Sequence, residues 1–145
     1  MKRDRLETAI RKTLHQSGRS NAGSDLTSLE VLSAGGEGIS DLSRLRDAKN
    51  LTYLDLSNNR ITDITALSGL TKLTELNLRS NQITDITPLA NLINLKELWL
   101  YENQITDLTP LGKLKNLSKL YLGLNDISDD QKAMLKKTLP NCDIT

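Results

Sequence analysis

Aspartate recurs every 22 residues along most of this 145-residue chain. The column consists of Asp41, Asp63, Asp85, Asp107 and Asp129. Stacked carboxylates could bind Ca²⁺, which prefers oxygen ligands. Ser or Thr stands beside each aspartate, however, and this pattern is typical of Asp that accepts backbone N–H groups at the start of a short turn. We therefore interpret the column as turn caps and expect no metal site.

Asparagine forms a second column with the same spacing. Its members are Asn59, Asn81, Asn103 and Asn125. A column of amides could bind a ligand, but an amide also offers both a donor and an acceptor to backbone groups that leave a strand and turn inward. We favour this internal role. The preceding segment carries Glu37 at the equivalent position, within GGEG, and there we expect a looser edge.

Residue types suited to catalysis are scarce. The chain has one cysteine, Cys142, and one histidine, His15, far apart in the sequence. A nucleophilic thiol needs a base beside it. The GGEG stretch at 35–38 does not have the spacing of a phosphate-binding loop. We expect no catalytic residue and no cofactor, so the sequence argues against an enzyme.

These columns belong to an internal repeat of 22 residues. Leucine accounts for 29 of the 145 residues and phenylalanine is absent. The units begin at residues 29, 51, 73, 95 and 117, and the second and third are identical at 12 of 22 positions. Each follows LxxLxLxxNxI and then TD(I/L)TxLxxL. The last two leucines of LxxLxL are two residues apart, so they point to one side of an extended strand. Stacked units then form a parallel sheet of five strands, with leucines on one face and variable residues on the open face.

The motif resembles that of leucine-rich repeat proteins of the short 22-residue type, such as the repeat region of bacterial internalins. The resemblance implies an α/β fold: a right-handed solenoid with a parallel β-sheet on the concave face and short turns or 3-10 segments on the convex face. It also implies that partners bind to the concave face.

The ends of the stack need caps. We expect one domain over 1–145, with an N-terminal helical cap at 1–28, five repeats at 29–128, the last one truncated, and a C-terminal helical cap at 129–145. Apolar residues at helical spacing predict a helix over 3–16, and SGRSNAGS should end it. The buried side should hold Leu6, Ala9, Ile10 and Leu14.

At the other end, Ser128 and Gln131 have the spacing of a capping box that opens a helix. Pro140 should end this helix. The residues expected to face the last repeat are Met134, Leu135 and Leu139.

All four aromatic residues fall on strand positions that point away from the leucines. Trp99 and Tyr121 share one position on adjacent strands, and Tyr101 follows on the same face. An aromatic centre with a charged rim is typical of a protein-binding surface. The candidate partner-binding residues are Tyr53, Glu75, Arg79, Glu97, Trp99, Tyr101, Lys119 and Tyr121. The alternative is that the rings only cover the sheet, because aromatic residues favour strands in general.

The sequence therefore predicts a non-catalytic module that binds a protein or peptide partner. The alternative is a structural or self-associating unit, a monomer or weak homodimer, and the regular repeats would also fit an engineered or consensus-derived scaffold.

The net charge of +1 argues against a partner that is a nucleic acid. No apolar run is long enough to span a membrane. MKRDRLETAIRKTLHQ is not a signal peptide, which favours the cytoplasm, or secretion if a signal has been removed.

Overall fold

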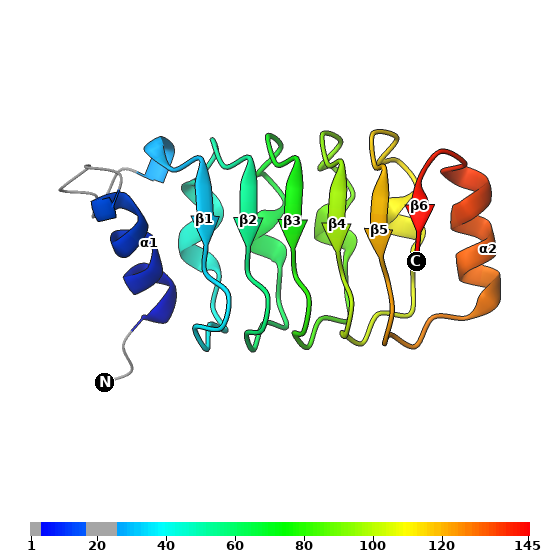
Figure 1. The fold of residues 1–145 in the computed structure, drawn as a ribbon, viewed down its shortest axis with the longest axis horizontal. Helices are drawn as coiled ribbons and strands as arrows, with labels where there is room; N and C mark the ends of the chain where they lie inside the picture. The colour runs from blue at the N-terminus through cyan, green and yellow to red at the C-terminus, as the bar shows by residue number, and fades with distance from the viewer. Residues whose placement is uncertain (1–3, 17–25) are drawn as a thin grey trace.

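A computed structural model describes residues 4–16 and 26–145 of the chain. Six short strands lie side by side in chain order and pair in parallel, between a helix at each end of the stack (Figure 1). The strands are β1 (Val31–Ser33), β2 (Tyr53–Asp55), β3 (Glu75–Asn77), β4 (Glu97–Trp99), β5 (Lys119–Tyr121) and β6 (Asp143–Ile144). The helices are α1 (Arg5–Gln16) and α2 (Asp129–Thr138). This arrangement is the solenoid expected from the repeat.

Short 3-10 segments form the layer behind the sheet (Figure 1). They cover Ser43–Asp47, Thr65–Leu67, Thr87–Leu89 and Thr109–Leu111, and a further short segment, Leu26–Ser28, leads into β1. Their apolar residues meet the leucines of the strands in one continuous core, in which Leu54, Leu76 and Leu98 are fully buried. Equivalent leucines pair in register from strand to strand, so each repeat covers the apolar face that its neighbour leaves open.

The sixth strand is a correction to the expected five. After α2 the chain returns beside β5, and the β6 residue Ile144 pairs in register with Leu120. The backbone N–H groups of Asp143 and Thr145 donate to the carbonyls of Ser118 and Leu120, at 2.8 and 2.9 Å. The LPNCDIT tail therefore extends the sheet, because an edge strand offers unpaired backbone groups that any nearby extended segment can bond.

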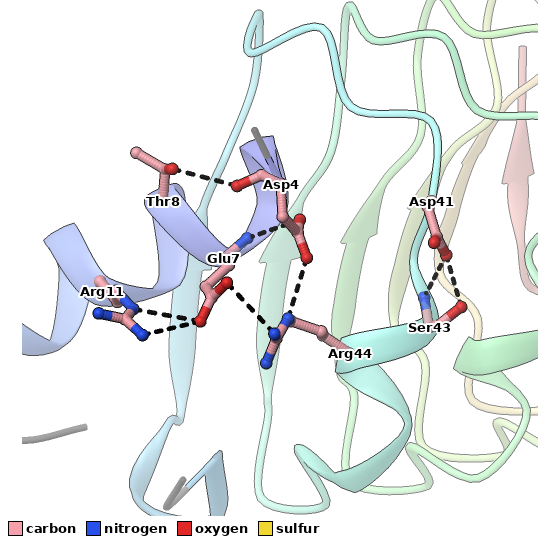
Figure 2. Close-up of polar contacts among 7 residues, drawn as sticks. All are labelled: Asp4, Glu7, Thr8, Arg11, Asp41, Ser43 and Arg44. Carbon is pink, nitrogen blue, oxygen red and sulfur yellow. Dashed lines mark hydrogen bonds and ion pairs between the residues drawn. The ribbon is translucent and has the colours of Figure 1, made fainter. Parts of the chain in front are cut away.

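Helix α1 packs against the first repeat as the apolar spacing predicts, with Leu6, Ile10 and Leu14 almost fully buried and Ala9 also buried. Its first turn is capped by Asp4, whose Oδ1 accepts a hydrogen bond from the Glu7 N–H. Figure 2 shows Arg44, from the first 3-10 segment of the repeats, reaching the carboxylates of Asp4 and Glu7 at 2.9 and 3.2 Å. The linker SGRSNAGS and Ser24–Asp25 lie outside the described residues.

Helix α2 begins as predicted, because the Ser128 hydroxyl accepts a hydrogen bond from the Gln131 N–H. Only half of the capping box is present. The Gln131 side chain instead accepts a hydrogen bond from the N–H of Leu108, 2.8 Å away in the last complete repeat. Leu135 and Leu139 are buried, but Met134 is 37% exposed, so the expectation that it faces the last repeat is wrong. The helix ends at Thr138, two residues before Pro140.

The aspartate column has the predicted capping role in four of its five members. Asp41, Asp63, Asp85 and Asp107 each accept hydrogen bonds from the backbone N–H and the hydroxyl of the Ser or Thr two residues later. These hydrogen bonds lower the pKa of all four carboxyls. Asp129 differs: it is the first residue of α2, and Ser128 is the cap. The C-terminal helix replaces the 3-10 turn at that place.

The asparagine column is internal, as predicted. The amide of Asn103 donates to the carbonyls of Leu78 and Leu100, and its oxygen accepts from the N–H of Ile83, all within 3.1 Å. Asn59, Asn81 and Asn125 repeat this pattern. Each amide thus joins the turn of one repeat to the repeat before it.

Candidate interaction surface

The strand alternation separates two faces of the sheet. On β4, Leu98 is fully buried, whereas Glu97 and Trp99 on either side of it are half-buried and point to the opposite face. The same holds on β2 and β5, so Tyr53 and Tyr121 also lie on this open face. The structure thus places all four aromatic side chains, including Tyr101 just after β4, outside the leucine core.

Trp99 and Tyr121 form a stacked pair in the C-terminal half of the face. They are in register on β4 and β5. Their ring centroids are 5.5 Å apart and their planes differ by 11°. Parallel strands place equivalent side chains about 4.8 Å apart, which suits stacked rings. The strand register therefore places the two rings side by side on the open face.

Tyr101 lies beside this pair and is held from two sides. The guanidinium carbon of Arg79, from the preceding repeat, lies 5.5 Å from the centre of the Tyr101 ring, which is a cation–π contact. The other neighbour is Gly123, from the following repeat: a Cβ added there would be 2.8 Å from the ring. The absence of a side chain at Gly123 therefore lets the Tyr101 ring lie close to the backbone.

The charged residues form a row next to the aromatic group. Glu75, Glu97 and Lys119 are in register on β3, β4 and β5. The Lys119 ammonium lies 4.0 Å from a carboxylate oxygen of Glu97, and both side chains are partly exposed. Such a pair contributes little to stability. Asp143 of β6 extends the row beyond Lys119.

Tyr53 is separated from the other three aromatic residues. It is in register with Glu75, which is in register with Glu97 of the Trp99 strand. Two strand spacings amount to about 10 Å, so Tyr53 and Trp99 are not neighbours. Burial raises the pKa of the Tyr53 hydroxyl, and the negative charges of Asp55 and Glu75 raise it further. The predicted group is therefore a cluster around Trp99 with Tyr53 at its far edge.

Two polar residues of this face were not among the predicted site residues. Asp55 and Asn77 occupy on β2 and β3 the position that Trp99 occupies on β4. Their side chains accept hydrogen bonds from the N–H groups of Ser57 and Arg79, two residues later. Asp and Asn commonly make such local turns. At this position the open face is therefore polar on β2 and β3 and aromatic on β4 and β5.

The residues that follow the strands have an unusual backbone conformation. Asn58, Ser80, Glu102 and Leu124 all have positive φ, between 54° and 60°. They form left-handed turns at the edge of the sheet, and the glycine and asparagine at this position of the first two repeats are the signal for it. Ser57 stands two residues after β2, where strand alternation predicts an outward-facing side chain, but it is only 8% exposed, so this prediction is wrong.

Four further features of the described residues concern possible metal ligands, membrane-spanning helices, the cysteine thiol and a surface groove. Within 4–16 and 26–145, no three His, Cys, Asp or Glu side chains are grouped so that they could hold a metal ion. The same ranges contain no helix of the length and apolar character needed to cross a membrane. Burial raises the pKa of the Cys142 thiol, which disfavours the reactive thiolate. An open groove of about 820 Å³ lies between α1 and the first repeat, at the end of the stack remote from Trp99.

Comparison with known proteins identifies the fold. The family model for leucine-rich repeats, in two copies, matches residues 49–91 and 93–133. The structure of an internalin (inlF) from Listeria monocytogenes is similar with a TM-score of 0.84 and 35% identity, over 96% of this chain and 41% of that one. Internalin C2 of the same organism is similar with a TM-score of 0.61 and 31% identity, over 97% of this chain and 81% of that one.

The structural likeness extends to a protein solved in a complex. The structure of the TLR13–ssRNA13 complex is similar with a TM-score of 0.64 and 26% identity, over 77% of this chain and 20% of that one. No curated protein sequence matches the chain. Since the repeat model covers more than half of the residues, and the strands, turns and asparagine column have the expected geometry, this protein belongs to the leucine-rich repeat family, whose fold typically serves as a protein–protein interaction module.

Proposed function

We propose that residues 1–145 act as a single non-catalytic module that binds a protein or peptide partner on the concave face of the sheet. The centre of the contact is formed by Trp99, Tyr101 and Tyr121. The rim consists of Tyr53, Glu75, Arg79, Glu97 and Lys119. The observation that carries the proposal is the stacked pair of Trp99 and Tyr121, which lies on the open face and is half-buried rather than part of the core.

The energetics of binding support this assignment. Association loses affinity when side chains must be ordered at the interface. The Trp99 and Tyr121 rings already hold each other, and Tyr101 is held between Arg79 and Gly123. Aromatic and arginine side chains are also the types that contribute most to protein interfaces. A partner would therefore meet a surface that is rigid before contact.

Pull-down with the immobilised protein tests the proposal. The Trp99/Tyr101/Tyr121 triple-alanine variant should lose the proteins that the wild type captures. Ile93→Ala is the matched control, because Ile93 is 54% exposed but lies outside the strands of the sheet. Circular dichroism should show that both variants are folded. Capture of the same proteins by wild type and triple variant would contradict the proposal.

Self-association through the same surface is the second candidate, since the half-buried stacked rings of the open face could also pack against a second copy. Mass measured in solution over a range of concentrations separates the two. A dimer that the triple-alanine substitution dissociates would favour self-association. A mass that stays at 16.1 kDa at all concentrations would exclude self-association and favour the binding of a different partner.

A further inference from the structure

Tyr121 stacks on one face of the Trp99 ring, and among the described residues no second ring stacks on the opposite face, here called the free face. Trp99 is in register with Tyr121 on one side and with Asn77 on the other. Tyr121 stacks on the indole face that looks toward β5. The opposite face looks toward β3, above Asn77. The side-chain oxygen of Asn77 is turned to the N–H of Arg79, 3.0 Å away, so this amide is bonded to its own backbone.

Two carboxylates stand next to this free face. Glu75 and Glu97 precede Asn77 and Trp99 by two residues on the same strands, and they are in register with each other. Like charges in register on adjacent strands repel. Glu97 is 4.0 Å from Lys119, but within the described ranges the Glu75 carboxylate has no hydrogen bond or ion pair. A cation placed between Glu75 and Glu97 would relieve this repulsion.

The excess of negative charge is local to the sheet. Along the strands and the residues just after them, the open face carries Asp55, Glu75, Glu97 and Asp143 against Arg79 and Lys119. Both cations are engaged, Arg79 with the Tyr101 ring and Lys119 with Glu97. The whole chain has a net charge of +1. The acidity of this face therefore does not follow from the composition of the whole protein. A negatively charged face repels nucleic-acid phosphates.

We propose that the partner is a basic protein segment, and that it places an arginine side chain in the space bounded by the free face of Trp99, by Asn77, and by the carboxylates of Glu75 and Glu97. A guanidinium is planar and can stack on the indole while its N–H groups donate to carboxylates. Lysine has the charge but not the plane, so it fits less well. This inference rests on the proposed function, because it names the chemistry of the partner at the same surface.

Selection from a random library of short displayed peptides on the immobilised protein provides the probes. The enriched peptides should contain arginine more often than the library does. One enriched peptide is then synthesised in two forms, one with arginine and one with citrulline, which has nearly the same shape but no charge. Trp99 is the only tryptophan of the chain, so its fluorescence reports binding at this place.

For the wild type, citrulline should raise the dissociation constant by about tenfold, since a desolvated cation–π contact and a charge pair are both lost. In the Glu75→Gln/Glu97→Gln variant the arginine peptide should bind about tenfold more weakly, and the difference between the two peptides should largely disappear. Glu30→Gln, an exposed carboxylate before β1, is the matched control and should change neither value.

The outcomes separate this inference from the proposed function. Enriched peptides that need Trp99 and Tyr121 but contain no excess of arginine, or that bind equally well with citrulline, would overturn the arginine site and leave the binding surface standing. Binding to the Trp99/Tyr101/Tyr121 triple-alanine variant, which has no tryptophan, is measured by calorimetry. Enriched peptides that bind this variant as well as the wild type, or a selection that enriches none, would count against both.

Discussion

Trp99 and Tyr121 stack on the open face of two neighbouring strands, and directly before them Leu98 and Leu120 pair in the same register on the buried face. Two contacts made by adjacent residues thus have different consequences. The leucines close the core between two repeats, whereas the rings are supported by it. This separation allows the surface to be altered without loss of the fold.

Substitutions on β4 should show this difference. Leu98→Ala should lower the free energy of unfolding by about 2–5 kcal/mol, because it leaves a cavity in the core. Trp99→Ala should cost about 1 kcal/mol, the usual contribution of an aromatic pair. Urea unfolding followed by far-UV circular dichroism measures both. Equal losses would show that Trp99 belongs to the core.

The internal asparagines should contribute far more to the free energy of unfolding than asparagines at the surface. Asn103→Ala removes four hydrogen bonds, one of them long, and leaves the buried N–H of Ile83 without a partner, so we expect a loss of about 2–4 kcal/mol. Asn94→Ala is the control: Asn94 is exposed and donates one bond to the carbonyl of Thr71, so its loss should be about 1 kcal/mol or less. Urea unfolding of the two variants provides the comparison, and similar values would contradict the internal role.

Acid should destabilise the protein through the aspartate caps. Hydrogen bonds from Thr87 lower the pKa of Asp85. The pKa values of Asp41, Asp63 and Asp107 are lowered in the same way by the Ser or Thr two residues later. Because each pKa is lower in the folded than in the unfolded state, the ionised caps stabilise the fold above the ordinary Asp pKa of about 3.9. This contribution is lost as the pH falls below that value and through the folded pKa.

Replacing all four of these aspartates by asparagine checks the acid effect. The asparagine oxygen can still accept the backbone N–H, but it has no charge to lose. The variant should therefore be less stable than the wild type at pH 7, and the difference should shrink at pH 3. Urea unfolding at the two pH values measures this. A difference that stays constant with pH would exclude the proposed linkage.

The left-handed residue after β5 offers a stabilising substitution. Leu124 has a φ of 54° and is 65% exposed, so it combines backbone strain with little burial. Leu124→Asn should raise the free energy of unfolding by about 0.5–1 kcal/mol, because Asn tolerates this conformation better. Asn58→Leu, at the same position after β2, should lower it. Thermal unfolding of both variants gives the sign of each change. A destabilised Leu124→Asn variant or a stabilised Asn58→Leu variant would contradict the explanation by backbone strain.

The 22-residue repeat was sufficient to predict the parallel strands, the buried leucines, the internal asparagines and most of the aspartate caps. Each of these depends on residues that are close in the sequence or one repeat apart, so the period carries the information. It also predicted the face on which Trp99 and Tyr121 lie, because strand alternation assigns alternate residues to opposite faces.

Other features depended on contacts that the repeat does not encode. The tail forms β6 because the edge of β5 has unpaired backbone groups, and Gln131 bonds to Leu108 because α2 packs against the last complete repeat. The position of Arg79 over Tyr101 and the free side of Trp99 depend on which rotamers fit between neighbouring strands. A periodic sequence determines which residues share a face, whereas the way in which particular side chains fill that face is decided only when the strands pack together.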